Sequence, residues 1–92
     1  MQNKALLMNQ KDNVAVVLQA TEKNDSVQII DNQQNNQRIQ AIESIDIYHK
    51  IAVKKILKGQ EIIKYGEIIG KAEEDIPAGA HVHVHNIRSV KV

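Results

Sequence analysis

Three histidines alternate with valines near the end of the chain, in the segment 81–86, HVHVHN. Successive side chains of a β-strand face opposite sides, so the valines can enter a core while His81, His83 and His85 share the other face. Imidazole binds metal ions and titrates near neutral pH, so this face could hold a metal ion or exchange protons. A solvated histidine-rich surface is the alternative interpretation.

The spacing along a strand limits which histidines can act together. Neighbouring positions on one face lie about 6.5 to 7 Å apart, so His81 and His83 can converge on one ion. His85 could join them only if the strand bends. A complete metal site therefore needs a ligand from elsewhere in the fold or from a partner chain, and His49 is the only other histidine. An ordinary structural role is the alternative for His49.

A second candidate for chemistry is the pair Lys64 and Tyr65, which lies between two Ile-Ile pairs. An ammonium and a phenol can both donate hydrogen bonds to a carboxylate. On an ordinary strand the same pair would simply be the outward-facing polar set. The sequence has no cysteine, and it lacks a glycine-rich phosphate loop, a nucleophile elbow and a zinc-finger spacing.

The elements that carry these residues are expected to be strands of one small domain spanning residues 1–92, because 92 residues bury too little surface for two. Phe and Trp are absent, and 14 Ile and 9 Val stand against 4 Leu. This β-branched excess favours strands. We therefore predict a mainly β fold whose core consists of branched aliphatic side chains, with strands over 4–8, 13–18, 27–30, 38–42, 50–56, 61–65, 67–72 and 81–86.

A short turn pattern recurs at 45–48 (IDIY), 56–59 (ILKG) and 76–79 (IPAG). Gly59 and Gly79 can adopt the positive φ that ends a tight turn, and Pro77 presets φ early in its turn. Tyr48 occupies the equivalent position without a glycine's freedom, so a left-handed backbone there would cost about 1 kcal/mol. The amide-rich segment 31–37 is expected to be a hairpin loop.

Charge and hydropathy exclude several function classes. The formal charge is +1, with neither a Lys/Arg stripe nor interleaved aromatic residues, so a nucleic-acid-binding role is not expected. The longest apolar run, 14–18, is far shorter than the ~20 residues of a membrane span, and no signal peptide is recognised at the N-terminus. We therefore expect a cytoplasmic protein without a membrane partner.

Residues 61–89, EIIKYGEIIGKAEEDIPAGAHVHVHNIRS, strongly resemble the N-terminal domain of altronate dehydratases. That domain has an I-K-Y-G-x-x-I-G run, a D-I-x-x-G turn and a triple-histidine strand ending in Asn. The segment 12–18, DNVAVVL, is similar to its D-N-V-A strand, and 49–52 falls where the family has G-H-K-x-A-L. Tyr48 replaces the family glycine. Galactarate dehydratases lack the triple-histidine strand, whereas the sulfolactate sulfo-lyase small subunit carries it.

The resemblance implies a SAF-type domain with a β-clip fold and a hydro-lyase that removes water from a sugar acid, assisted by a divalent metal, most simply Fe²⁺. It implies that this chain is a small subunit or separately encoded domain, completed by a large catalytic dehydratase subunit. The alternatives are the sulfolactate sulfo-lyase small subunit and a non-catalytic module that binds a metal or a small acid. The residues carried over are His49, His81, His83 and His85 as catalytic, His81 and His83 as metal ligands, and Lys50, Lys64, Tyr65 and Asn86 as substrate-binding. The histidines could act as ligands, as acid–base groups or as residues that close over a partner's site.

Overall fold

The computed structural model describes residues 3–31, 37–83 and 85–88, and in these ranges it contains strands and turns but no helix. The prediction of a mainly β fold is confirmed. The strands are β1 (Asn3–Leu7), β2 (Val14–Val17), β3 (Ser26–Asp31), β4 (Gln37–Gln40), β5 (Lys50–Ala52), β6 (Glu61–Lys64), β7 (Glu67–Ala72), β8 (His81–Val82) and β9 (Ile87–Arg88).

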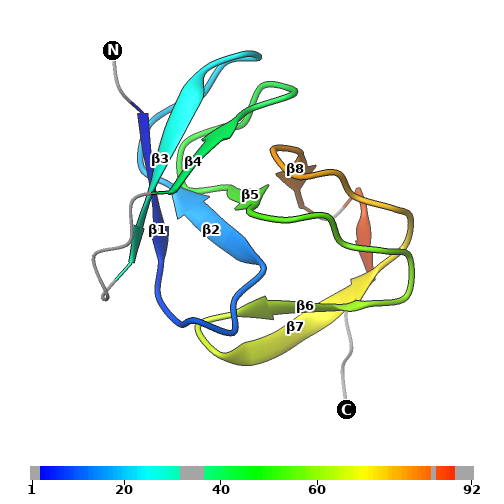
Figure 1. The fold of residues 1–92 in the computed structure, drawn as a ribbon. Coiled ribbons are helices and arrows are strands. Elements are labelled where there is room, and N and C mark those ends of the chain that lie inside the picture. The colour runs from blue at the N-terminus through cyan, green and yellow to red at the C-terminus, as the bar shows by residue number, and fades with distance from the viewer. Residues whose placement is uncertain (1–2, 32–36, 84, 89–92) are drawn as a thin grey trace.

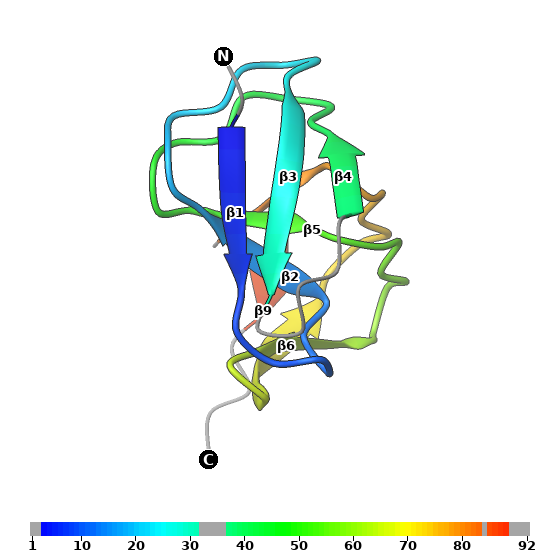
Figure 2. The same cartoon turned by 60° about the vertical axis from the view of Figure 1, so that its left-hand side comes forward.

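The strands form two sheets, which contact each other where β2 of one lies next to β6 of the other. The larger sheet has the order β4-β3-β1-β2-β5-β8, in which β1 and β3 run parallel and the other pairs run antiparallel. It curls, so that side chains of β5 meet those of β3 and β4 in the core, and the β6–β7 hairpin lies below β5 (Figure 1). Figure 2 shows β1, β3 and β4 side by side on one face. This curled all-β arrangement is consistent with a small β-clip-like SAF fold.

Two clusters of buried aliphatic side chains form the core. One lies among β1 to β5 and the other among β5 to β8. Isoleucine dominates both, as the composition predicts, and the largest side chains that are almost fully buried are Ile29, Ile45, Ile51, Ile56, Ile62 and Ile76. Branched side chains of this kind pack well on pleated strands. The histidine-bearing β8 is anchored to the second cluster through Val82.

The three predicted turns are present and share one geometry. Tyr48, Gly59 and Gly79 have φ angles of 67°, 86° and 89°. The Tyr48 amide donates to the Val17 carbonyl (2.9 Å), and the Gly79 amide donates to the Ala52 carbonyl (2.8 Å). The left-handed conformation at Tyr48 is therefore fixed by pairing with a neighbouring strand, as the sequence pattern requires.

A fourth turn of the same kind is one that the sequence analysis missed. It starts at Thr21 and ends at Asn24, whose φ is 77°. Thr21 and Ile45 exchange two backbone hydrogen bonds of 2.8 Å, and Ile56 and Ile76 exchange an equivalent pair. The four turns thus face one another as two pairs. The signal was hidden because Thr replaces the leading Ile and Asn replaces the closing Gly.

Two predicted strands are wrong in length. The strand expected over 50–56 ends at Ala52, because Ile56 already begins the next turn. The strand expected over 81–86 consists of His81–Val82 alone, and Ile87–Arg88 form a separate strand that was not predicted. The loop expected over 31–37 falls mainly on 32–36, which lie outside the described residues.

Candidate functional site

His49 is positioned by one of the four turns. It directly follows Tyr48 and directly precedes β5. The Val17 amide donates to the His49 carbonyl (2.9 Å), and the His49 amide donates to the Asp46 carbonyl (3.0 Å). Both backbone polar groups of His49 are therefore engaged, and its half-buried imidazole is held at the edge where β5 meets β8.

His81 and His83 reach the same edge from β8 and from the bend that follows it. His81 pairs with Ile51 of β5, and its amide donates to a carboxylate oxygen of Glu43 (2.9 Å). The bend is stabilised by Asn86, whose side-chain amide donates to the His81 carbonyl (2.8 Å) and accepts from the His83 amide (3.0 Å). A buried asparagine thus replaces the missing strand hydrogen bonds, and this is why the strand expected to continue to residue 86 stops at Val82.

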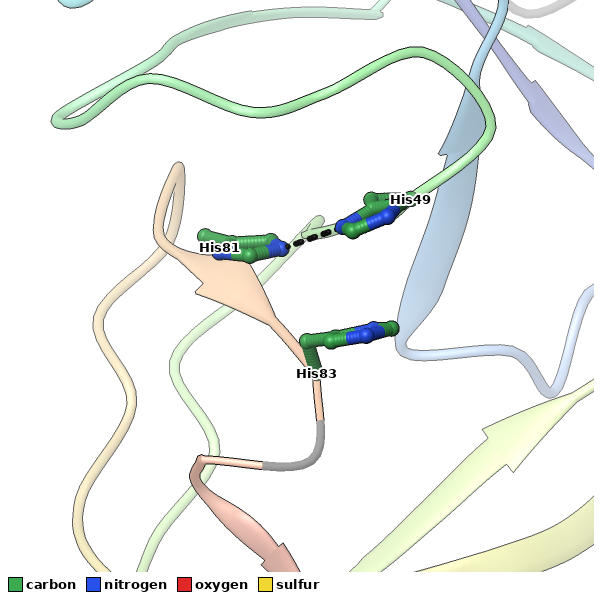
Figure 3. Close-up of side chains that lie close together, drawn as sticks. All are labelled: His49, His81 and His83. Atoms are coloured by element: carbon green, nitrogen blue, oxygen red, sulfur yellow. Dashed lines mark hydrogen bonds between the residues drawn. The ribbon is translucent and has the colours of Figure 1, made fainter.

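The three imidazoles lie close together with nearly parallel rings (Figure 3). Ring centroids are 4.1 Å apart for His49 and His83, 5.1 Å for His49 and His81, and 5.5 Å for His81 and His83. His49 Nδ1 and His81 Nε2 are 2.9 Å apart and share a hydrogen bond. One ligand nitrogen from each ring lies within 4.8 Å of the others. We call these three residues the histidine cluster.

The histidine cluster has the chemistry of a transition-metal site. Tetrahedral ligand nitrogens at ~2.1 Å from one ion lie about 3.4 Å apart, so the three stacked rings would have to turn and approach by roughly 1 Å or more to converge on an ion. The buried Nδ1 of His83 has no hydrogen-bond partner among the described residues, although buried polar atoms are normally satisfied. Three imidazoles suit Zn²⁺, Fe²⁺ or Ni²⁺ rather than Ca²⁺ or Mg²⁺. The donor set and the unsatisfied nitrogen therefore both fit a bound divalent metal.

The electrostatic surroundings favour the neutral histidines that a metal requires. Burial lowers the pKa of His83, and the nearby His49 and Lys50 lower it further against an opposing effect of Asp46. Burial also lowers the pKa of His81, assisted by His85 and the other two histidines of the cluster, against Glu43. The lowered pKa values therefore keep His81 and His83 neutral at neutral pH, the form that a metal ion requires.

Of the two lysines predicted from the sequence, Lys50 lies beside the histidine cluster. Burial lowers the pKa of Lys50, and the charge of Lys64 lowers it further. Lys50 in turn lowers the pKa of His83, so its ammonium group is close enough to interact with both Lys64 and His83. The Lys64 Nζ lies 4.9 Å from the centre of the Tyr65 ring, and Tyr65 is 51% exposed. Two cations that repel each other next to a candidate metal site form a favourable environment for a carboxylate ligand.

His85 and Asn86 differ from the other predicted site residues. His85 is exposed, and its ring is tilted against that of His81 at a centroid distance of 5.0 Å. It therefore lies beside the histidine cluster rather than within it. Asn86 is only 3% exposed, and its amide is bonded to the backbone of the histidine segment. The structure gives Asn86 a positioning contact, while its predicted substrate contact stays a prediction.

Asp12 and Asn13 hold β6 and the turn that follows it, a role that the sequence analysis did not assign. The buried Asp12 carboxylate accepts hydrogen bonds from the amides of Asn9 (3.2 Å), Tyr65 (3.0 Å) and Gly66 (2.8 Å). Tyr65 and Gly66 both have positive φ, at 56° and 76°. Asn13 bonds to the backbone of β6 on both sides of its bulge, through the Glu61 carbonyl and the Ile63 amide.

Asp12 thus fixes the left-handed turn that follows Lys64 and includes Tyr65. The available signal was the adjacent pair of short polar residues directly before an apolar strand, which is typical of side chains that satisfy nearby backbone groups.

The fold and the site together describe a β-clip-like domain with a three-histidine centre flanked by lysines. The family model for the altronate/galactarate dehydratase SAF domain matches residues 3–90. The chain belongs to this family.

Curated relatives agree with this assignment. The altronate dehydratase of Escherichia coli K12 is 41% identical over 78 residues, which cover 85% of this chain and 15% of that protein. The altronate dehydratase of Bacillus subtilis 168 is 33% identical over 82 residues, or 89% of this chain and 16% of that protein. This chain therefore spans only about a sixth of the altronate dehydratases that it matches.

This chain matches a larger share of a shorter relative. Subunit alpha of the (2R)-sulfolactate sulfo-lyase of Paracoccus pantotrophus is 44% identical over 52 residues, which make up 56% of this chain and 78% of that subunit.

No helix in the described part of the chain is long and apolar enough to cross a membrane.

Proposed function

We propose that this chain is the SAF component of a metal-dependent sugar-acid dehydratase of the altronate type, which removes water to give a 2-keto-3-deoxy acid. The observation that carries the proposal is the convergence of His49, His81 and His83 in a chain of the altronate/galactarate dehydratase SAF family. The metal that the proposal favours is Fe²⁺, since imidazole nitrogen is a suitable ligand for it.

The chemistry of dehydration assigns roles to the residues around the histidine cluster. A proton must leave the carbon next to the substrate carboxylate, and hydroxide must depart from the neighbouring carbon. Lys50 and Lys64 would bind the carboxylate, and Tyr65 would donate to one of its oxygens. His85, which lies outside the cluster but touches His81, would exchange a proton with the substrate. A metal held by the cluster would supply the Lewis acid for the departing oxygen.

A small domain of two sheets offers few further groups around the histidine cluster, so we propose that a larger catalytic portion completes the site. The altronate dehydratases are several times longer than this chain, and the shorter relative is named as a subunit. The second candidate function is therefore the alpha subunit of a sulfolactate sulfo-lyase, in which sulfite leaves instead of hydroxide. It is favoured by the 78% coverage of that subunit.

The experiment is to purify the full chain with its large partner, add Fe²⁺ under anaerobic conditions and assay altronate and sulfolactate. We expect turnover of one of the two acids. Lys64→Gln should raise KM for that acid more than it lowers kcat, because it removes a carboxylate contact. Lys23→Gln, an exposed lysine in another turn, is the matched control. The absence of turnover with any partner or metal, combined with tight metal binding, would instead favour the non-catalytic binding module.

A further inference from the structure

A cavity lined by lysines lies apart from the histidine cluster. It has a volume of about 520 Å³ and contains Lys11, Lys54, Lys55 and Lys71 in its wall. The volume falls within the range of about 300–1,000 Å³ that is typical of small-molecule sites. None of the three clustered histidines, and neither Lys50 nor Lys64, belongs to its lining. The cavity is therefore a feature that the proposed dehydratase chemistry does not use.

The four lysines come together through the fold rather than through a run in the sequence. Lys11 lies between β1 and β2, Lys54 and Lys55 follow β5, and Lys71 is in β7. Glu61 is the only carboxylate in the wall, so the lining has a formal charge of +3, whereas the whole chain has +1. The lining of this one concave surface is thus more positive than the protein as a whole.

This charge is not neutralised within the protein. Glu61 lies opposite Lys71 in the β6–β7 ladder, but no ion pair joins any of the four lysines to a carboxylate in the ranges 3–31, 37–83 and 85–88. Ammonium groups held around one concavity repel one another, and an anion bound between them relieves this repulsion. Although these exposed lysines are solvated, their combined charge favours a negatively charged ligand at this surface.

The wall of the cavity is rigid enough to define a site. Asn13 lines it and is fixed by hydrogen bonds of 2.8 Å to the Glu61 carbonyl and from the Ile63 amide. Gly59, at the closing position of its turn, leaves open space where a side chain would point. Hydrogen bonds therefore hold this part of the backbone in place, and the long lysine side chains can adapt to the shape of an anion.

We propose that this cavity binds a small anion with two or more negative groups, of the polyphosphate or polycarboxylate class. A single charge would leave most of the lysines unsatisfied, whereas several linked charges can contact lysines from all three segments. The proposal is independent of the dehydratase function, because it involves neither the histidine cluster nor its lysines.

The test is an NMR titration of the full ¹⁵N-labelled, metal-free chain with pyrophosphate and, separately, with citrate, at constant ionic strength. We expect saturable shifts centred on the amides of Gly59, Gln60 and Glu61. Saturation by pyrophosphate alone identifies a phosphate-bearing ligand, saturation by citrate alone identifies a polycarboxylate, and saturation by both means that charge number decides. Acetate, with one charge, should not saturate.

The double variant Lys54→Gln/Lys55→Gln should weaken binding at least about fivefold, because two of the four attracting charges are lost. Both side chains are exposed, so the fold is retained, and an unchanged spectrum elsewhere verifies this. Lys4→Gln/Lys23→Gln removes the same charge from exposed positions outside the cavity and should leave the affinity unchanged. Shifts that do not saturate, that are spread over all lysines, or that fall equally in both double variants would overturn the proposal. Because neither metal nor substrate is present, the result is separate from that of the activity assay.

Discussion

Replacing Tyr48 by glycine should stabilise the protein. Its φ of 67° lies in the left-handed region, which costs a residue with a Cβ roughly 1–2 kcal/mol. Glycine removes this strain but adds about 0.4–1 kcal/mol of entropy to the unfolded chain. The Tyr48 ring is 68% exposed, so little packing is lost. We therefore expect a net stabilisation of about 0.5–1 kcal/mol, from the strain relieved minus the entropy gained by the unfolded state.

The equivalent glycines provide the reverse experiment. A Cβ at Gly59 would meet no atom within 4 Å, so Gly59→Ala should cost the strain less the entropy that the unfolded chain loses, a net of about 0.5–1 kcal/mol. A Cβ at Gly79 would overlap the Gln40 carbonyl oxygen, so Gly79→Ala should destabilise the protein by clearly more. Tyr48→Ala keeps the strain and removes the ring, which makes it the control for side-chain packing.

The assay is urea unfolding of the metal-free protein, supported by thermal melts, in which 1 kcal/mol corresponds to roughly 4–8 °C for a domain of this size. We expect Tyr48→Gly to have a higher free energy of unfolding than the wild type, and Gly59→Ala a higher one than Gly79→Ala. If Tyr48→Gly were destabilised as much as Tyr48→Ala, the ring rather than the backbone would determine the effect. The interpretation of the turn as strained would then be refuted.

Three further predictions concern the residues around the site. Asp12→Asn should destabilise the protein by about 1–3 kcal/mol in urea unfolding, because an amide cannot accept all three backbone hydrogen bonds. Asn86→Ala should weaken metal binding although Asn86 is outside the cluster, because the bend that aligns His81 and His83 loses two hydrogen bonds. The metal-free protein should lose stability as the pH falls below about 6.5, since His81 and His83 have lowered pKa values when folded and the unfolded chain takes up more protons.

Each of these predictions has a contradicting result. A loss below about 0.5 kcal/mol for Asp12→Asn would mean that water replaces the carboxylate at no cost. Unchanged metal affinity in Asn86→Ala would show that the orientation of the histidines does not depend on the Asn86 hydrogen bonds. The stability should have its full value above the unfolded pKa of about 6.5 and should decline as the pH falls from there to the lower folded values. A stability that instead rises on acidification would contradict the direction of both pKa shifts.

Much of the fold could be predicted because its determinants are local. The β-branched excess indicates strands, and the closing glycines indicate turns with positive φ. Since the turns share one pattern, even the left-handed Tyr48 followed from its position. The turn at Thr21–Asn24 was missed because both marker residues differ. The parallel pairing of β1 and β3 could not be predicted, since no local signal identifies a strand partner distant in sequence.

The site was predictable in residue type but not in geometry. Alternation suggested that His81 and His83 share a face, and His49 was the only histidine left to join them. The structure brings these three together by a bend at His83 that depends on the Asn86 side chain, whereas the alternation pattern indicated a straight strand. The role of Asp12 depends on hydrogen bonds to Tyr65 and Gly66, more than fifty residues away. The lysine cavity likewise exists only after three separate segments have been folded together.

The central claim is that His49, His81 and His83 form one metal centre, and Co²⁺ titration monitored by visible absorption tests it most directly. The wild-type chain should bind one Co²⁺ and develop ligand-field bands, and His83→Ala should lower the affinity at least about tenfold by removing one of three nitrogens. His85→Ala is the matched control, because it removes an adjacent exposed histidine that lies outside the cluster, and it should retain the bands. Equal losses in His83→Ala and His85→Ala, or no ligand-field bands in the wild type, would contradict the assignment.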